Sequence, residues 1–188
     1  MTQIKPADGD AMKTLTLLRH AKSGWDDAVP RDFDRPLNPK GRRAAQVIGR
    51  FLKTQGAAFD HVLASPALRV VETLVEVEYG YGRALAPAWD KRVYLASAAT
   101  LLDLIRELPE AAGTALVVGH NPGLEDLVLD LVADGGDLRD AVEAKYPTAA
   151  VAVMTWDGGW ADLRSGAATL EAFTRPRDLD ATLGPDED

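Results

Sequence analysis

The chain has 188 residues, of which 46% are hydrophobic and 27% are charged, as in a single soluble globular domain. It contains no cysteine, which excludes a disulfide framework, a thiolate metal site and a cysteine nucleophile. The net charge of −8 disfavours nucleic acid and anionic membrane surfaces as partners, because both bind basic surfaces.

The two ends of the chain are expected to be tails around one domain. Residues 1–12 lack the apolar core of a signal peptide, and no apolar run approaches the roughly 20 residues of a membrane span. We therefore expect a cytoplasmic protein with a domain at residues 13–179 and an acidic C-terminal tail at residues 180–188. No sequence signal fixes the oligomeric state, and a monomer is the expectation.

The first predicted strand is the short apolar segment Thr14–Leu18, which leads directly to His20. A polar segment, residues 21–37, follows, and loops of that length in a compact domain are often functional. Asn38 and Pro39 then predict the start of a helix, because Asn is a good N-cap and Pro is favoured at the first helical position.

The same order of strand and helix recurs twice along the chain. His61–Ala64 predicts a strand, and Ser65-Pro66 predicts the start of the helix after it. Thr114–Val118 predicts another strand, and Asn121-Pro122 predicts the start of the next helix.

Weaker elements complete the pattern. A strand is expected near residues 85–88 and a helix near residues 98–108, and the chain closes with strands at Thr148–Trp156 and Ala168–Phe173. Alternating strands and helices predict parallel pairing with helices on both faces. The predicted fold is therefore α/β, a single-domain three-layer sandwich with a mostly parallel central sheet and an antiparallel edge.

Polar side chains are expected at the rim of this sheet, where ligands of such folds bind beyond the carboxyl ends of the strands. Arg19 and His20 follow the first strand, His120 follows a later one, and Arg69 lies in the first turn of a predicted helix. Arginine holds phosphate oxygens in pairs, and a neutral imidazole can attack phosphorus as a covalent nucleophile. These residues predict a phosphoryl-transfer site.

Three segments resemble the signatures of the histidine phosphatase superfamily: Leu18–Ser23, Ser65–Thr73 and Gly119–Pro122. Two further segments, Asp34–Asn38 and Lys145–Thr148, are similar to those of its SixA branch, the small phosphohistidine phosphatases. The resemblance extends over most of the chain, with the three signatures in the order and at the spacing of the family.

The resemblance implies a role for each of four residues. His20 would accept the phosphoryl group, Arg19 and Arg69 would hold its oxygens, and His120 would form the fourth wall of the pocket and stabilise the transition state. The resemblance implies no metal and no cofactor. It implies a phosphorylated partner as substrate, either a protein or a small phosphoester.

Two more residues, Asp26 and Asn121, are expected to contact the substrate. Asp26 falls where related phosphoglycerate mutases carry an asparagine near the phosphate. Asn121 stands where the acid-phosphatase branch carries a proton-donating aspartate, and asparagine cannot supply that proton. The sequence therefore does not identify the general acid, and the candidates are Asp26, Asp27, Asp32, Asp34 and Asp90.

The absence of an evident general acid affects which class of substrate the site is expected to hydrolyse. A phosphoester needs its leaving oxygen protonated, whereas the leaving nitrogen of a phosphohistidine can arrive already protonated. The chain also lacks the large insertion that forms a lid in bigger relatives. Both features favour phosphohistidine on a signalling or phosphotransfer protein. A general phosphatase of small esters, a phosphoglycerate-mutase-like isomerase and a non-catalytic phosphate-binding module remain alternatives.

Overall fold

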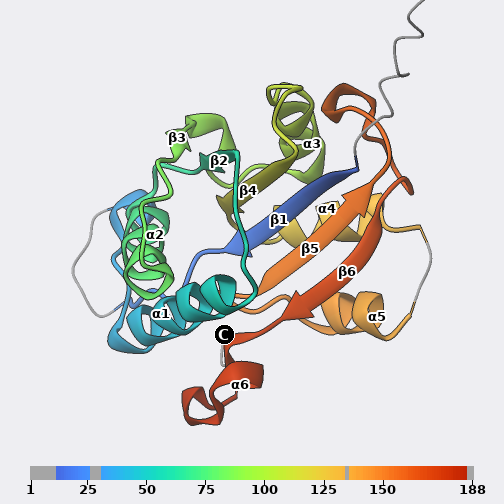
Figure 1. Cartoon of the computed structure of the whole chain (residues 1–188). Coiled ribbons are helices and arrows are strands. Elements are labelled where there is room, and N and C mark those ends of the chain that lie inside the picture. Colours follow the sequence, from blue (N-terminus) through green and yellow to red (C-terminus); the bar gives the residue numbers. More distant parts are fainter. Residues whose placement is uncertain (1–11, 26–30, 134–135, 186–188) are drawn as a thin grey trace, which may run out of the picture.

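The computed structural model describes residues 12–25, 31–133 and 136–185. Its six-stranded sheet has the order β3-β2-β4-β1-β5-β6 (Figure 1). Strands β3, β2, β4 and β1 pair in parallel, and β5 and β6 pair antiparallel at the β1 side of the sheet. The strands are β1 (Lys13–Arg19), β2 (His61–Ala64), β3 (Ala88–Trp89), β4 (Thr114–Gly119), β5 (Val151–Trp156) and β6 (Thr169–Thr174).

Helices cover both faces of the sheet, which confirms the predicted α/β sandwich (Figure 1). The α-helices are α1 (Pro39–Thr54), α2 (Leu68–Tyr81), α3 (Ala98–Arg106), α4 (Gly123–Leu131), α5 (Asp137–Ala144) and α6 (Pro176–Leu179). Short 3-10 helices are η1 (Asp32–Asp34), η2 (Lys91–Val93), η3 (Trp160–Asp162) and η4 (Ala181–Leu183). Among the helices so described, none is both long and apolar enough to cross a membrane.

Side chains of β1 alternate between two hydrophobic clusters because successive residues of a strand point to opposite faces. Leu15 and Leu17 pack in the cluster with α3, α4 and α5, whereas Leu18 packs in the cluster with α1 and α2. The helices α1 and α2 approach closely at Gly49 and Gly80, where an added Cβ would collide with the backbone of the opposite helix. Nearer the start of α2, Oγ1 of Thr73 accepts a hydrogen bond from the backbone N–H of Ala21 at 2.9 Å, which ties the helix to the segment that follows β1.

Two helices begin later than the sequence predicts. The helix expected at Ser65-Pro66 starts at Leu68, and the helix expected at Asn121-Pro122 starts at Gly123, after a cis peptide bond. The expected cap residues do not cap these helices: Ala67 and Pro122 take the N-cap positions, and the side chains of Ser65 and Asn121 bond to His120 and Tyr146.

Other boundaries also differ from expectation. The strand expected near residues 85–88 is only the two residues of β3. The sequence does not predict α5, whose only buried residue is Val142, so it carries no apolar stripe. Beyond the expected end of the domain, η4 buries Leu183 in the cluster with α1 and α2. Residues 1–11 and 186–188 of the expected tails lie outside the described residues.

Three strands bring their carboxyl ends to one edge of the sheet. In the parallel register Arg19 of β1 lies opposite Gly119 of β4, and Ala64 of β2 lies opposite Val118 of β4. The antiparallel β5 enters from the same edge, since Val151 pairs with Leu18. The residues that follow β1, β2 and β4, together with those that precede β5, therefore meet at this edge.

Candidate active site

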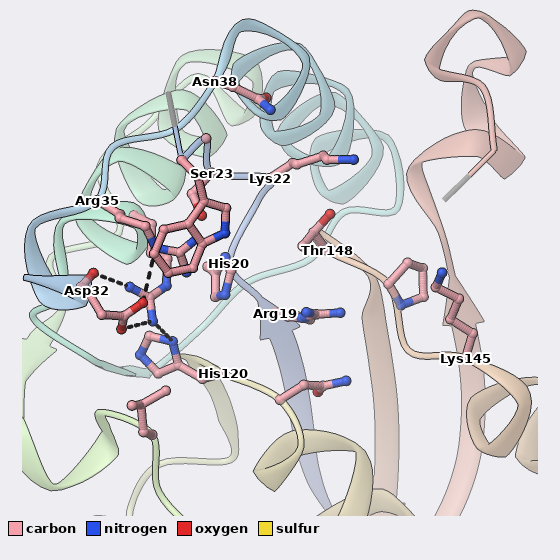
Figure 2. Close-up of a pocket in the computed structure, with 16 residues that line it drawn as sticks. Arg19, His20, Lys22, Ser23, Asp32, Arg35, Asn38, His120, Lys145 and Thr148 are labelled. Atoms are coloured by element: carbon pink, nitrogen blue, oxygen red, sulfur yellow. Dashed lines mark hydrogen bonds and ion pairs between the residues drawn. The ribbon is translucent and has the colours of Figure 1, made fainter. Parts of the chain in front are cut away.

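A cavity of ≈ 550 Å³ opens at this edge (Figure 2). It is lined by five of the six residues that the sequence predicts for the site: Arg19, His20, Arg69, His120 and Asn121. The sixth, Asp26, lies outside the described residues. The fold thus collects residues from three separate segments of the chain around one cavity, as the strand pattern predicts.

His20 follows β1 directly and is buried. Its backbone N–H donates to the carbonyl oxygen of Gly119 at 3.0 Å, and its ring Nδ1 lies 2.7 Å from the carbonyl oxygen of Ala21. A carbonyl oxygen can only accept, so Nδ1 carries the proton of the neutral ring. The lone pair is then on Nε2, the tautomer that a nucleophile attacking through Nε2 requires.

The electrostatics of the site keep both histidine rings neutral. The pKa of His20 lies well below 6.5, mainly because burial disfavours the charged ring, an effect that Arg69 and Arg19 reinforce and the hydrogen bond to Ala21 opposes. The pKa of His120 is lowered to about 3, first by burial and next by the charge of Arg69. A neutral His20 is what nucleophilic attack needs.

We expect both rings to remain neutral at pH 6 in the ligand-free protein, where a free imidazole with a pKa near 6.5 is mostly protonated, and ¹⁵N NMR of the imidazoles would detect this directly. His20→Ala and His120→Ala variants would assign the signals. The unfolded chain takes up these two protons near pH 6.5, so the free energy of unfolding should fall as the pH decreases below that value. Titration of either ring near pH 6.5 in the folded protein would contradict this prediction.

Arg69 lies in the first turn of α2 and is 2% exposed. Asp32 holds the end of its guanidinium: Nη1 donates to the backbone oxygen at 2.8 Å and Nη2 to the carboxylate at 3.0 Å, as dashed lines show in Figure 2. The Nε atom is buried and has no hydrogen-bond partner among the described residues. Arg69 therefore has a fixed orientation, and its guanidinium contributes a positive charge to the cavity lining.

His120 follows β4, and its ring centroid lies 5.3 Å from that of His20. Its Nδ1 lies 3.3 Å from Nη2 of Arg69 and must accept, because a guanidinium only donates. Its Nε2 therefore carries the proton and donates to Oγ of Ser65 at 2.7 Å. Both ring nitrogens face protein partners here, so contact between His120 and the phosphoryl group remains a prediction.

Arg19 is anchored by Tyr146, a residue of the segment that precedes β5. Its Nη1 donates to the carbonyl oxygen of Tyr146 at 2.8 Å, and the buried Tyr146 hydroxyl donates to the backbone of Leu17 at 2.8 Å. The segment that precedes β5 thus positions the guanidinium beside the cavity. The sequence marks residues 145–148 only by resemblance and does not reveal this contact.

Among the described acid candidates, only Asp32 lines the cavity. Although partial burial opposes it, the hydrogen bond from Tyr94 and the charge and hydrogen bond of Arg69 lower the pKa of Asp32. Its carboxylate also accepts from Nε of Arg35 at 3.0 Å and from the Tyr94 hydroxyl at 2.7 Å. An ionised carboxylate with three donors is a poor proton donor, so Asp32 is better suited to positioning Arg69.

The other candidate acids do not lie at the reaction centre, as far as the structure describes them. Asp34 pairs with Arg31 at 2.6 Å, and Asp90 pairs with Arg92 at 2.8 Å; neither lines the cavity. Asp26 and Asp27 fall outside the described residues.

The cavity is cationic although the chain as a whole has a net charge of −8. Its described lining has Asp32 as the one acidic residue against five basic ones: Arg19, Lys22, Arg35, Arg69 and Lys145. Such a local field attracts an anion that the rest of the surface repels. Within the described ranges, no three His, Asp or Glu side chains gather as a metal site would require.

Sequence reasoning missed the residues that orient the expected site. The sequence pattern predicts Ser65 as a helix cap, but in the structure its hydroxyl bonds to His120. Asp32 is one of several aspartates in a polar segment of the sequence, but in the structure its carboxylate bonds to Arg69. Tyr94, which bonds to Asp32, carries no sequence signal at all.

Comparison with known proteins agrees with this geometry. The sequence profile described as histidine phosphatase superfamily (branch 1) matches residues 15–92. An uncharacterised protein of Mycobacterium tuberculosis is 36% identical over 164 residues, which are 85% of this chain and 100% of that protein.

Solved structures with the same fold extend the comparison over most of the chain. A protein of Nakamurella multipartitia that is assigned as the phosphohistidine phosphatase SixA is 32% identical, with a TM-score of 0.78 over 90% of this chain and 99% of that chain. Its counterpart from Agrobacterium tumefaciens, assigned in the same way, is 28% identical, with a TM-score of 0.74 over 87% of this chain and 98% of that chain.

Proposed function

This chain belongs to the SixA-type branch of the histidine phosphatase superfamily, and on that basis we propose that it is a phosphohistidine phosphatase with His20 as nucleophile. The observation that carries the proposal is the His20 ring, held neutral with its Nε2 lone pair available in a cationic cavity. A phosphate-binding module without turnover would not need that tautomer.

In the first step Nε2 of His20 attacks phosphorus as the P–N bond of the substrate breaks, and the bonding electrons stay on the leaving imidazole. The new P–N bond places positive charge on the His20 ring, and the Ala21 carbonyl that accepts from Nδ1–H stabilises it. Arg19 and Arg69 offset the negative charge on the phosphoryl oxygens. In the second step water attacks phosphorus, the bond to Nε2 breaks, and inorganic phosphate leaves.

The choice of phosphohistidine over a phosphoester rests on the acid chemistry of the cavity. Asp32, the acidic residue of its described lining, accepts hydrogen bonds from Arg69, Arg35 and Tyr94 and has a lowered pKa. The described lining offers no other carboxyl group to protonate an alkoxide, whereas a phosphohistidine whose second ring nitrogen is protonated leaves as neutral imidazole. The partner would be a signalling or phosphotransfer protein that carries the modified histidine.

The direct test is phosphate release from a phosphohistidine-bearing phosphotransfer protein, with glycerol phosphate as the matched substrate that needs a general acid. We expect kcat/KM for the phosphoprotein to exceed that for the ester by at least about 10²-fold, the usual contribution of general acid catalysis. Equal rates would indicate a general phosphatase. A long-lived phosphoenzyme that returns its phosphate to a sugar acid would indicate an isomerase, and release from neither substrate would reject phosphatase function.

A further inference from the structure

Two exposed apolar side chains, Trp25 and Leu95, line the cavity although neither takes part in the proposed mechanism. Trp25 lies in the segment after β1 and is 76% exposed, and Leu95 lies shortly after η2 and is 56% exposed. The reacting groups are much less accessible, since His20 is 7% exposed and Arg69 is 2% exposed. This difference places the indole and the leucine at the mouth of the cavity and the reacting groups at its floor.

The indole of Trp25 has a fixed position despite its exposure. The guanidinium of Arg35 lies over the ring, with Cζ at 3.9 Å from the ring centroid, as in a cation–π contact. Arg35 is fixed in turn by its ion pair with Asp32, in which Nε lies 3.0 Å from Oδ1. An aromatic ring that is already oriented loses little conformational freedom on binding, which suits it to anchor an interface.

Leu95 is held at the mouth in a backbone conformation that is unfavourable for leucine. Its φ is 50°, in the left-handed region that residues other than glycine seldom adopt. Because the side chain is more than half exposed, hydrophobic burial offsets little of this strain. Strained residues in folded proteins concentrate at functional positions, and this one lines the cavity of the candidate active site.

The proposed substrate would bring a protein surface to this mouth. A histidine side chain is short, so a phosphoryl group that reaches the buried His20 leaves the backbone of the substrate protein at the opening of the cavity. Side chains around the phosphohistidine must then pack against the residues of the mouth. The cavity lining also includes Lys22 and Lys145, so the complementary surface is apolar and acidic, not basic.

We infer that Trp25 and Leu95 form the docking surface for the protein that carries the phosphohistidine, where they contact apolar side chains next to that histidine. This inference rests on the proposed function and adds the recognition of the partner to it. Free phosphohistidine or a small phosphoester occupies the floor of the cavity and does not need either side chain. Trp25 and Leu95 therefore determine the preference for a protein substrate and not the rate of the chemical steps.

The experiment compares two substrates that share the same P–N bond: a phosphohistidine-bearing phosphotransfer protein, and free N-phosphohistidine, which has no protein surface. Trp25→Ala removes the indole, and Trp25→Phe keeps an aromatic ring. Leu95→Asn introduces a polar residue that tolerates a positive φ. Tyr79→Ala is the matched control, because Tyr79 is also 76% exposed but does not line the cavity. Thermal unfolding of each variant checks the fold.

We expect Trp25→Ala to lower kcat/KM for the phosphoprotein by at least about tenfold, through a higher KM with nearly unchanged kcat, because only binding is lost. Leu95→Asn should lower it about fivefold, and Trp25→Phe should lose less than Trp25→Ala. Activity towards free phosphohistidine should change by less than about threefold in every variant. Tyr79→Ala should match the wild type with both substrates.

Three results would overturn the inference and leave the proposed function intact. The first is a change of less than about threefold for the phosphoprotein in both Trp25→Ala and Leu95→Asn. The second is an equal loss with free phosphohistidine, which would mean that the two side chains act on the reacting group itself. The third is an equal loss in Tyr79→Ala. If the wild-type protein releases phosphate from neither substrate, the proposed function fails and the inference fails with it.

Discussion

Replacing His20 by alanine should abolish phosphate release from a phosphohistidine-bearing protein, with a loss of at least about 10⁴-fold. The reason is that no other described side chain presents a neutral nitrogen lone pair in the cavity, since Nδ1 of His120 accepts from Arg69. Acid-quenched reactions with ³²P-labelled substrate should show a labelled enzyme for the wild type and none for His20→Ala.

The matched control for this experiment is His61→Gln. His61 begins β2, whose carboxyl end, not its start, faces the site, so activity should be retained. Thermal unfolding should show that His20→Ala still folds, because the substitution removes a side chain from the edge of the cavity and not from the hydrophobic clusters. Labelled phosphoenzyme in His20→Ala would assign the nucleophile elsewhere.

Replacing Arg69 by alanine should lower kcat by roughly 10²–10³-fold, the usual effect of removing a preorganised group that stabilises transition-state charge. The guanidinium is buried, oriented by Asp32 and bonded to His120, so its charge acts in a site of low dielectric constant. Steady-state kinetics with both a phosphohistidine protein and p-nitrophenyl phosphate would measure the loss.

Asp32→Asn provides a graded comparison for Arg69→Ala. It keeps the backbone oxygen that accepts from Nη1 and weakens only the contact with Nη2, so we expect a loss of about tenfold or less. A loss in Asp32→Asn as large as that in Arg69→Ala would give Asp32 a direct part in the reaction. A loss below tenfold in Arg69→Ala would mean that its charge does not act on the phosphoryl group.

The fold and the members of the site could be predicted from local patterns. Short apolar runs such as Thr114–Val118 identify buried strands, and the helices between them imply parallel pairing. Residues that directly follow such strands must meet at one edge of the sheet. This is why Arg19, His20 and His120 could be assigned to one cavity before any distance was known.

The state and orientation of these side chains were decided by tertiary contacts alone. Asp32 and Arg69 are 37 positions apart in the chain, and Ser65 and His120 are 55 apart, so no local pattern pairs them.

The same holds for the chemistry of single atoms. The tautomer of His20 depends on one nearby carbonyl, and the orientation of the Asn121 amide depends on another. Sequence by itself determined that Arg19, His20 and His120 would lie at one edge of the sheet, because residues that directly follow parallel strands meet there. Only the tertiary structure decided which nitrogen can attack and which oxygen can accept, because hydrogen bonds between distant segments set proton positions and orientations.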